Sequence, residues 1–290
     1  MVGIGLAVLA VAGFAGLDTT TKWLSLGVPL MMAMFFRYLF QAVATTVAVF
    51  PSRGKALLHT RHPWLHGLRG LLLLGTSLFA FLSLKHMPVG EFTAIVMITP
   101  LVVTLLSARL LHEHVSGLRL LLVAGGFIGT LVIIRPGGQG FTWALLFPVG
   151  VVVINSAFQL LTSRMTRTED SMTLQFYTGW VGTLVAALTL PWAWVELRDA
   201  RLWLGLFLAG LLGTLGHYFL ILSYKRAPAS VLMPYIYVQI GFAMLGDWLL
   251  FAHVTDQWAL TGMAMVAVCG VAGAWLTAHE SRTTADPPEH

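Results

Sequence analysis

Residues 70–88 read GLLLLGTSLFAFLSLKHMP, and residues 210–228 read GLLGTLGHYFLILSYKRAP. The two stretches align without a gap at an offset of 140 positions, and eight of their nineteen positions are identical. Apart from leucines, the identities are Gly70/Gly210, Phe79/Phe219, Ser83/Ser223, Lys85/Lys225 and Pro88/Pro228. The same offset relates two further pairs, Met32/Met172 and Phe36/Phe176. One register therefore extends over both halves, and the chain contains a duplicated unit.

The composition is that of a membrane protein. Of the 290 residues 57% are hydrophobic and only 10% are charged, whereas soluble domains average roughly 45–50% apolar and about 25% charged residues. Gly, Pro and charge clusters divide the chain into ten apolar segments, near 3–23, 29–50, 65–84, 91–111, 117–134, 143–163, 172–190, 202–222, 229–251 and 257–277. Segments of roughly 17–25 residues are long enough to cross a bilayer as helices. A large soluble protein with buried helices is the alternative, but ten such segments leave almost no polar sequence to cover its core.

The repeat and the segments together predict an all-α integral membrane protein. Because each unit holds an odd number of spans, the two copies face opposite ways, as in the inverted repeats of secondary transporters. We expect ten transmembrane helices as two inverted five-helix repeats around a central cavity, with residues 1–136 as the first repeat and 137–278 as the second. The polar, Pro-containing segment 279–290 is expected to be a disordered cytoplasmic tail.

Positive charges in the short loops predict the orientation. Eleven Lys and Arg residues fall on one side of the ten segments and five on the other, and the richer side is expected to be cytoplasmic. Both termini are then cytoplasmic. The net charge of +5 is explained by loops lying against anionic lipid headgroups, so the lipid bilayer is the expected partner and nucleic acid is not.

Several chemistries lack their sequence signals. No GxxxxGK[ST] stretch is present, so no P-loop is predicted. His112-Glu113-His114 has i, i+2 spacing, whereas two metal ligands on one helical face need i, i+4. Cys269 is the single cysteine, which excludes an internal disulfide. We therefore expect no enzyme, no cofactor and no metal.

Polar residues near the middle of the apolar segments are the candidate site. A helix rises about 1.5 Å per residue, so the depth of each residue can be counted. Polar groups at this depth are costly toward lipid and should face a cavity. The residues from both halves are Arg37, Gln41, Thr76, Ser77, Thr99, Asn155, Trp180 and Gln239.

Arg37 and His217 each allow two interpretations. A charge at the depth of Arg37 costs about 2.5–3.5 kcal/mol on insertion scales, so it needs compensation by an ion pair with Asp18 or by a substrate carboxylate. His217 follows the glycines Gly210, Gly213 and Gly216, a small-residue seam for a neighbouring helix. It could carry a proton or be a neutral, hydrogen-bonded packing residue.

Prolines and aromatic residues complete the candidate set. Pro100 and Pro234 interrupt apolar segments, where proline removes a backbone hydrogen bond, and such interruptions in two halves indicate a binding site. Together with Pro88 and Pro228 they are the predicted hinges of the gates. An aromatic wall of the site is predicted from Phe79, Phe158, Trp180, Tyr235 and Tyr237.

These residues resemble a known family. The duplicated ten-segment pattern, Asp18 and Lys22 at the end of the first helix, Phe36-Arg37 in the second, and the proline junctions before the fourth and ninth helices are similar to the EamA branch of the drug/metabolite transporter superfamily. Within it, the chain most resembles the YddG-type bacterial exporters of aromatic and other amino acids. The resemblance implies a central cavity between inverted halves, with the fifth and tenth helices peripheral. One departure is His253, where many members have glutamate.

The functional expectation is a bacterial inner-membrane secondary transporter. It would export small amphipathic metabolites, amino acids and aromatic ones among them, by alternating access. If it is coupled to protons, His217 and Asp18 are the available titratable groups. A multidrug, nucleotide-sugar or phosphorylated-metabolite carrier on the same scaffold is the alternative, and a membrane-embedded enzyme acting on lipid headgroups is the remote one.

Overall fold

The computed structural model describes residues 2–54, 58–87, 89–111, 116–134, 144, 146–251 and 257–283, and within these ranges it is helical with no strand. The helices are α1 (Val2–Leu24), α2 (Leu30–Arg53), α3 (Pro63–His86), α4 (Val89–Val96), α5 (Thr99–Leu110), α6 (Gly117–Ile134), α7 (Leu146–Met165), α8 (Ser171–Ala193), α9 (Ala200–Arg226), α10 (Ala229–Ile236), α11 (Gln239–Phe251) and α12 (Gln257–Thr283). Five of the described helices are long and apolar enough to cross a membrane, over the ranges Val2–Leu24, Leu30–Ser52, Pro63–His86, Leu146–Met165 and Ala200–Arg226.

Helix boundaries recur at the offset that the sequence repeat has. Helices α4 and α10 begin at Val89 and Ala229, and α6 and α12 begin at Gly117 and Gln257, each pair 140 positions apart. Helix α12 continues to Thr283, beyond the boundary at 278 where the disordered tail was expected to begin.

Two of the expected spans are each divided into two helices. The apolar segment near 91–111 is interrupted at Met97–Ile98, between α4 and α5, and the segment near 229–251 at Tyr237–Val238, between α10 and α11. These interruptions are again 140 positions apart. The prolines are not equivalent, because Pro100 lies in the first turn of α5 and Pro234 lies inside α10. The positions of the interruptions are therefore equivalent in the two halves, whereas the positions of the nearby prolines are not.

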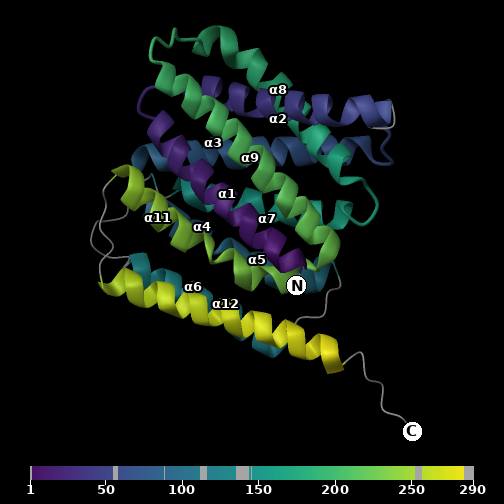
Figure 1. Cartoon of the computed structure of the whole chain (residues 1–290), viewed down its shortest axis with the longest axis vertical. Helices are drawn as coiled ribbons and strands as arrows, with labels where there is room; N and C mark the ends of the chain where they lie inside the picture. The colour runs from purple at the N-terminus through teal and green to yellow at the C-terminus, as the bar shows by residue number, and fades with distance from the viewer. Residues whose placement is uncertain are drawn as a thin grey trace.

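Helix packing pairs elements from the two halves. Helix α1 packs on α9 and α3 packs on α7, while α2 packs on α8. Helices α6 and α12 pack on each other and lie together at one side of the molecule, away from α2 and α8 (Figure 1). Under the 140-residue offset, the α1–α9 pair is equivalent to the α7–α3 pair.

Glycines allow these close approaches. A Cβ atom on Gly179 of α8 would lie 2.7 Å from the backbone nitrogen of Ala42 on α2. In the predicted seam of α9, a Cβ on Gly210 would meet the ring of Phe40 and a Cβ on Gly216 would meet the ring of Phe14. Small residues at a helix interface let a neighbouring helix approach closely, and in α9 the neighbours are α2 and α1.

Candidate functional site

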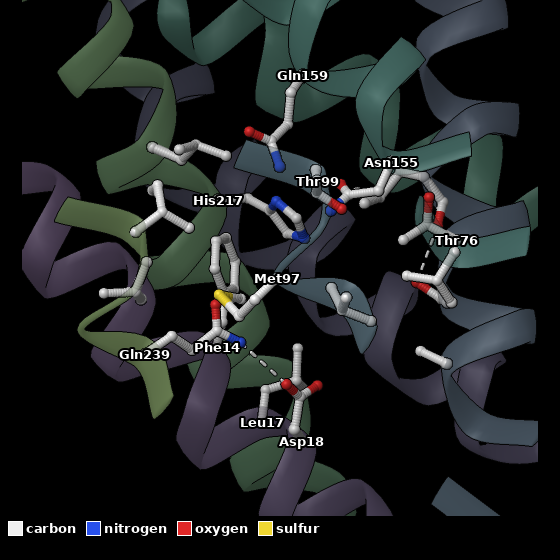
Figure 2. A pocket seen from close by; sticks show the side chains of 18 of the residues that line it. Phe14, Leu17, Asp18, Thr76, Met97, Thr99, Asn155, Gln159, His217 and Gln239 are labelled. Carbon is white, nitrogen blue, oxygen red and sulfur yellow. Dashed lines mark hydrogen bonds between the residues drawn. The ribbon is translucent and has the colours of Figure 1, made fainter. Parts of the chain in front are cut away.

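A cavity of about 100 Å³ lies where the interrupted helices meet α1, α2, α3, α7 and α9 (Figure 2). The ends of all four half-helices contribute, through Val96, Thr99, Ile236 and Gln239. The cavity therefore lies between the two copies of the repeat. Its sequence-predicted lining residues are Asp18, Arg37, Thr76, Ser77, Thr99, Pro100, Asn155, His217 and Gln239.

Arg37 connects the two halves across the cavity. It is 8% exposed, its Nη1 donates to Ser77 Oγ at 2.8 Å, and its Nη2 lies 3.4 Å from His217 Nε2. Ser77 and His217 are equivalent positions of the repeat, 140 residues apart, so one guanidinium contacts the same position in both copies. The absence of a side chain at Gly213 makes room for it, because a Cβ there would lie 3.1 Å from Arg37 Nε.

The contact with Arg37 also indicates which ring nitrogen of His217 carries the hydrogen. A guanidinium is a donor only, so Nε2 must accept and the neutral ring carries its hydrogen on Nδ1. The ring packs between Phe14 and Phe158, with centroids 4.7 and 5.6 Å away. His217 Nδ1 has no hydrogen-bond partner among the described residues. In this arrangement the ring is both packed and hydrogen-bonded, with one donor left over.

Asp18 has a different partner from the one expected. Its Oδ2 accepts a hydrogen bond from Gln239 Nε2 at 3.2 Å, and Gln239 is the first residue of α11. The expected ion pair with Arg37 is not among the contacts of the described residues, because Arg37 is held by Ser77 and His217. The carboxylate and the guanidinium therefore line one cavity without direct contact.

Thr99 and Asn155 point toward another part of the cavity than Asp18 and Gln239 (Figure 2). Thr99 is the first residue of α5 and is 2% exposed. Its hydroxyl has no partner within the part of the chain that the structure describes. Met97 and Phe14 lie between the two groups (Figure 2). The cavity thus combines separate polar regions with an apolar wall.

Six predicted site residues do not line this cavity. Gln41 donates to the Gln175 carbonyl at 3.1 Å, and Trp180 Nε1 donates to Thr46 Oγ1 at 3.2 Å. The other four are aromatic side chains that pack between helices, namely Phe79, Phe158, Tyr235 and Tyr237. Depth in the bilayer was predicted from the sequence, but the side of the helix on which each residue lies depends on packing. The aromatic wall is instead supplied by Phe14 and Phe92, which were not predicted.

The four predicted hinge prolines have different positions. Pro228 is the N-cap of α10, Pro234 lies within α10, and Pro100 is in the first turn of α5 and lines the cavity. Pro88 lies outside the described residues. Gln159 is a further lining residue that the sequence did not reveal, and its Oε1 accepts from the Tyr224 hydroxyl at 2.8 Å.

A second buried polar cluster joins α3 to α7 and α8. Arg69 is fully buried, and it donates to Thr162 Oγ1 at 2.9 Å, to the Leu174 carbonyl at 3.0 Å and to Thr178 Oγ1. One turn away, His66 Nε2 lies 3.6 Å from Glu169 Oε2. Under the 140-residue offset, the positions of Arg69 and His66 hold Ala209 and Leu206 in the second half. The cluster is therefore present in one half only, and it does not line the cavity.

Interrupted helices around a cavity between two halves are typical of a multi-pass membrane transporter. The model of the EamA-like transporter family matches residues 1–135. A riboflavin transporter of Rhizobium johnstonii is 30% identical over 273 residues, covering 92% of this chain and 88% of the relative. The chain belongs to the EamA-like transporter family, within the drug/metabolite transporter superfamily.

Other relatives show how widely the named cargo varies. An S-adenosylmethionine uptake transporter of Rickettsia felis is 26% identical, covering 92% of this chain and 90% of the relative. A pseudopaline exporter of Pseudomonas aeruginosa is 27% identical, covering 93% and 95%. A solved crystal structure with 22% identity superposes with a TM-score of 0.74 over 94% of this chain and 98% of its own, which shows the fold. The family expected from the sequence is confirmed, whereas the narrower resemblance to YddG-type amino-acid exporters is not supported by these relatives.

Proposed function

We propose that this protein is a secondary transporter that moves small, amphipathic, neutral or zwitterionic metabolites through the cavity by alternating access. The single observation that carries the proposal is the charge balance of the lining. Among the described lining residues, one carboxylate, Asp18, and one guanidinium, Arg37, face the same space without pairing. A neutral or zwitterionic molecule leaves this balance undisturbed, whereas a net charge would have to be buried uncompensated.

The topology proposed with this function is the one expected from the sequence. Ten spans form two inverted repeats, 1–136 and 137–278, with α4 plus α5 and α10 plus α11 each making one interrupted span, and both termini are cytoplasmic in the bacterial inner membrane. The recurrence of helix boundaries at 140 positions supports this proposal. Pro88, Pro100, Pro228 and Pro234 are proposed as hinges of the gates.

The cargo proposed is wider than the amino acids expected at first. The named relatives carry riboflavin, S-adenosylmethionine or pseudopaline. Riboflavin is neutral and combines a flat heteroaromatic ring with a polar chain, which suits a lining that has both an apolar wall and separated polar groups. S-adenosylmethionine has the same combination, but its sulfonium and ammonium outweigh its carboxylate, so its net positive charge fits the lining less well. Amino acids, aromatic ones included, remain one candidate within this class. Both uptake and export occur among the relatives' names, so flux is measured in both directions.

A carrier of phosphorylated metabolites is the less favoured candidate. A phosphate group usually needs several cationic side chains or helix N-termini, and Arg37 is the one Lys or Arg among the described lining residues. The size of the cavity has a consequence for every candidate substrate. At about 100 Å³ it is smaller than the roughly 300–1,000 Å³ of typical ligand pockets. Binding of any of these substrates therefore requires the two halves to move apart, as alternating access provides.

The test is flux into and out of proteoliposomes that contain the full chain. Labelled riboflavin, S-adenosylmethionine and tryptophan are compared with UDP-glucose, with and without an imposed pH gradient. Saturable flux of riboflavin or tryptophan and none of UDP-glucose is expected, whereas flux of S-adenosylmethionine alone, a cation at neutral pH, would contradict the argument from charge balance. A response to the pH gradient would identify a proton-coupled carrier, and indifference to it a facilitator. Saturable flux of UDP-glucose alone would overturn the proposed substrate class.

A further inference from the structure

The two halves differ at the N-termini of their second half-helices, α5 and α11. These helices begin at Thr99 and Gln239, 140 positions apart, and both first residues line the cavity. The N-terminus of a helix carries unpaired N–H groups and a partial positive charge, which favours an anion or an oxygen acceptor. Both N-termini therefore face one cavity, although their N–H groups differ: Pro100 has none, and the equivalent Ile240 N–H donates to the Tyr237 carbonyl at 3.1 Å.

At α11 the first residue is bonded through its side chain to a carboxylate of the protein itself. At α11, the Asp18 carboxylate accepts from the side chain of Gln239 at 3.2 Å. Asp18 comes from α1, which packs on α11. The same relation holds between α7 and α5, which also pack together. The residue of α7 equivalent to Asp18 is Phe158, 140 positions on, and its side chain is fully buried and apolar.

The site at α5 has donors without a partner. Thr99 is 2% exposed and its hydroxyl makes no hydrogen bond to any described residue. His217 lines the same cavity, and its Nδ1 is likewise unpaired in the described part of the chain. Asn155 of α7 points to the same part of the cavity as Thr99 (Figure 2). A buried polar group left without a partner costs about 1–3 kcal/mol, so a ligand that satisfies these groups is favoured.

We propose that the N-terminus of α5, with Thr99, Asn155 and His217, is the subsite that takes an acceptor oxygen of the substrate, in the place that Asp18 occupies at α11. The inference rests on the proposed transport function and gives the substrate an orientation in the cavity. Its acceptor oxygen, from a carboxylate or a ring carbonyl, lies at α5, and its cationic or donor group lies toward Asp18. Pro100 fits this role, because its lack of an N–H costs no helix hydrogen bond in the first turn.

The test compares binding to Thr99→Val and Thr104→Val in the purified full-length protein. Thr104 is the matched control, since it lies on the same helix, is fully buried and does not line the cavity, and its hydroxyl has no hydrogen-bond partner among the described residues. The probes are S-adenosylmethionine with its decarboxylated form, tryptophan with tryptamine, and riboflavin. For each probe that the wild type binds, we expect Thr99→Val to weaken the affinity about tenfold and Thr104→Val to leave it unchanged.

The probe pairs identify the acceptor group. If the loss occurs with a carboxylate probe and not with its decarboxylated form, the substrate carboxylate occupies the subsite; a loss with riboflavin assigns a carbonyl. Asn155→Asp should weaken carboxylate probes more than tenfold without weakening their decarboxylated forms, because it places a negative charge in the part of the cavity where the substrate carboxylate would bind. Equal affinities in Thr99→Val and Thr104→Val, with wild-type flux intact, would overturn the subsite alone. Absence of saturable flux of every probe in the wild type would overturn the transport proposal together with it.

Discussion

Replacement of Arg37 should separate its contribution to stability from its contribution to binding. Its two hydrogen bonds, to Ser77 and His217, involve a charged donor and are worth about 1.5–3 kcal/mol each. Burying the charge at this depth in the membrane costs about 2.5–3.5 kcal/mol. The two bonds together contribute about 3–6 kcal/mol, so after this cost the net contribution of Arg37 to the stability of the fold is about −0.5 to 3.5 kcal/mol. Arg37→Gln, which can still donate to one partner, should lower the Tm by only a few degrees.

The effect on binding should be larger. A substrate carboxylate about 6 Å from the guanidinium gains about 2.8 kcal/mol at an effective dielectric constant of 20, which is roughly a hundredfold in Kd. Arg37→Gln should therefore weaken zwitterionic probes by one to two orders of magnitude and riboflavin, which has no carboxylate, much less. Arg37→Lys is the control, because it keeps the charge while losing the geometry that reaches both acceptors.

The assay combines thermal unfolding in detergent, followed by tryptophan fluorescence, with equilibrium binding of S-adenosylmethionine, tryptophan and riboflavin. The expected order of affinity for zwitterionic probes is wild type, Arg37→Lys, Arg37→Gln. Folded Arg37→Gln protein with unchanged affinity for these probes would refute the reasoning. So would a large drop in Tm with no change in binding, because it would make Arg37 a structural residue.

Three further predictions follow from single contacts. His217→Gln should keep the pH profile of transport, because the neutral ring acts through hydrogen bonds that an amide can reproduce, and a changed profile would reinstate His217 as a proton carrier. Gly182→Ala should destabilise the protein by about 1–3 kcal/mol through overpacking, since the new Cβ would lie 2.4 Å from the Tyr38 ring. Gly67→Ala is the control: this position has open space around it, so the substitution should not lower the Tm. Lys22→Met should increase hydrogen exchange at the C-terminal end of α3, because Lys22 Nζ donates to the Met87 carbonyl at 2.8 Å; unchanged exchange there would mean that this bond does not hold the end of the helix.

The sequence by itself determined the class of protein, the duplication and the register between the halves. Composition and segment length depend on residue type alone, so no contact is needed to recognise a membrane protein, and identities such as Ser83/Ser223 are visible at a constant offset. The polar residues near mid-membrane were also recognisable, and of these Arg37, Thr76, Ser77, Thr99, Asn155 and Gln239 line the cavity.

Only the tertiary structure decided which partners these residues have. The sequence suggests an ion pair between Asp18 and Arg37. In the structure Asp18 accepts from Gln239 of α11, and Arg37 connects Ser77 to His217. The rotation of each helix about its axis decides whether Trp180 or Phe14 faces the cavity, and that rotation depends on glycine contacts between helices far apart in the chain. The interruptions at Met97 and Tyr237 are equivalent although the prolines near them are not, because the same packing, imposed twice, ends the helices where the two halves meet.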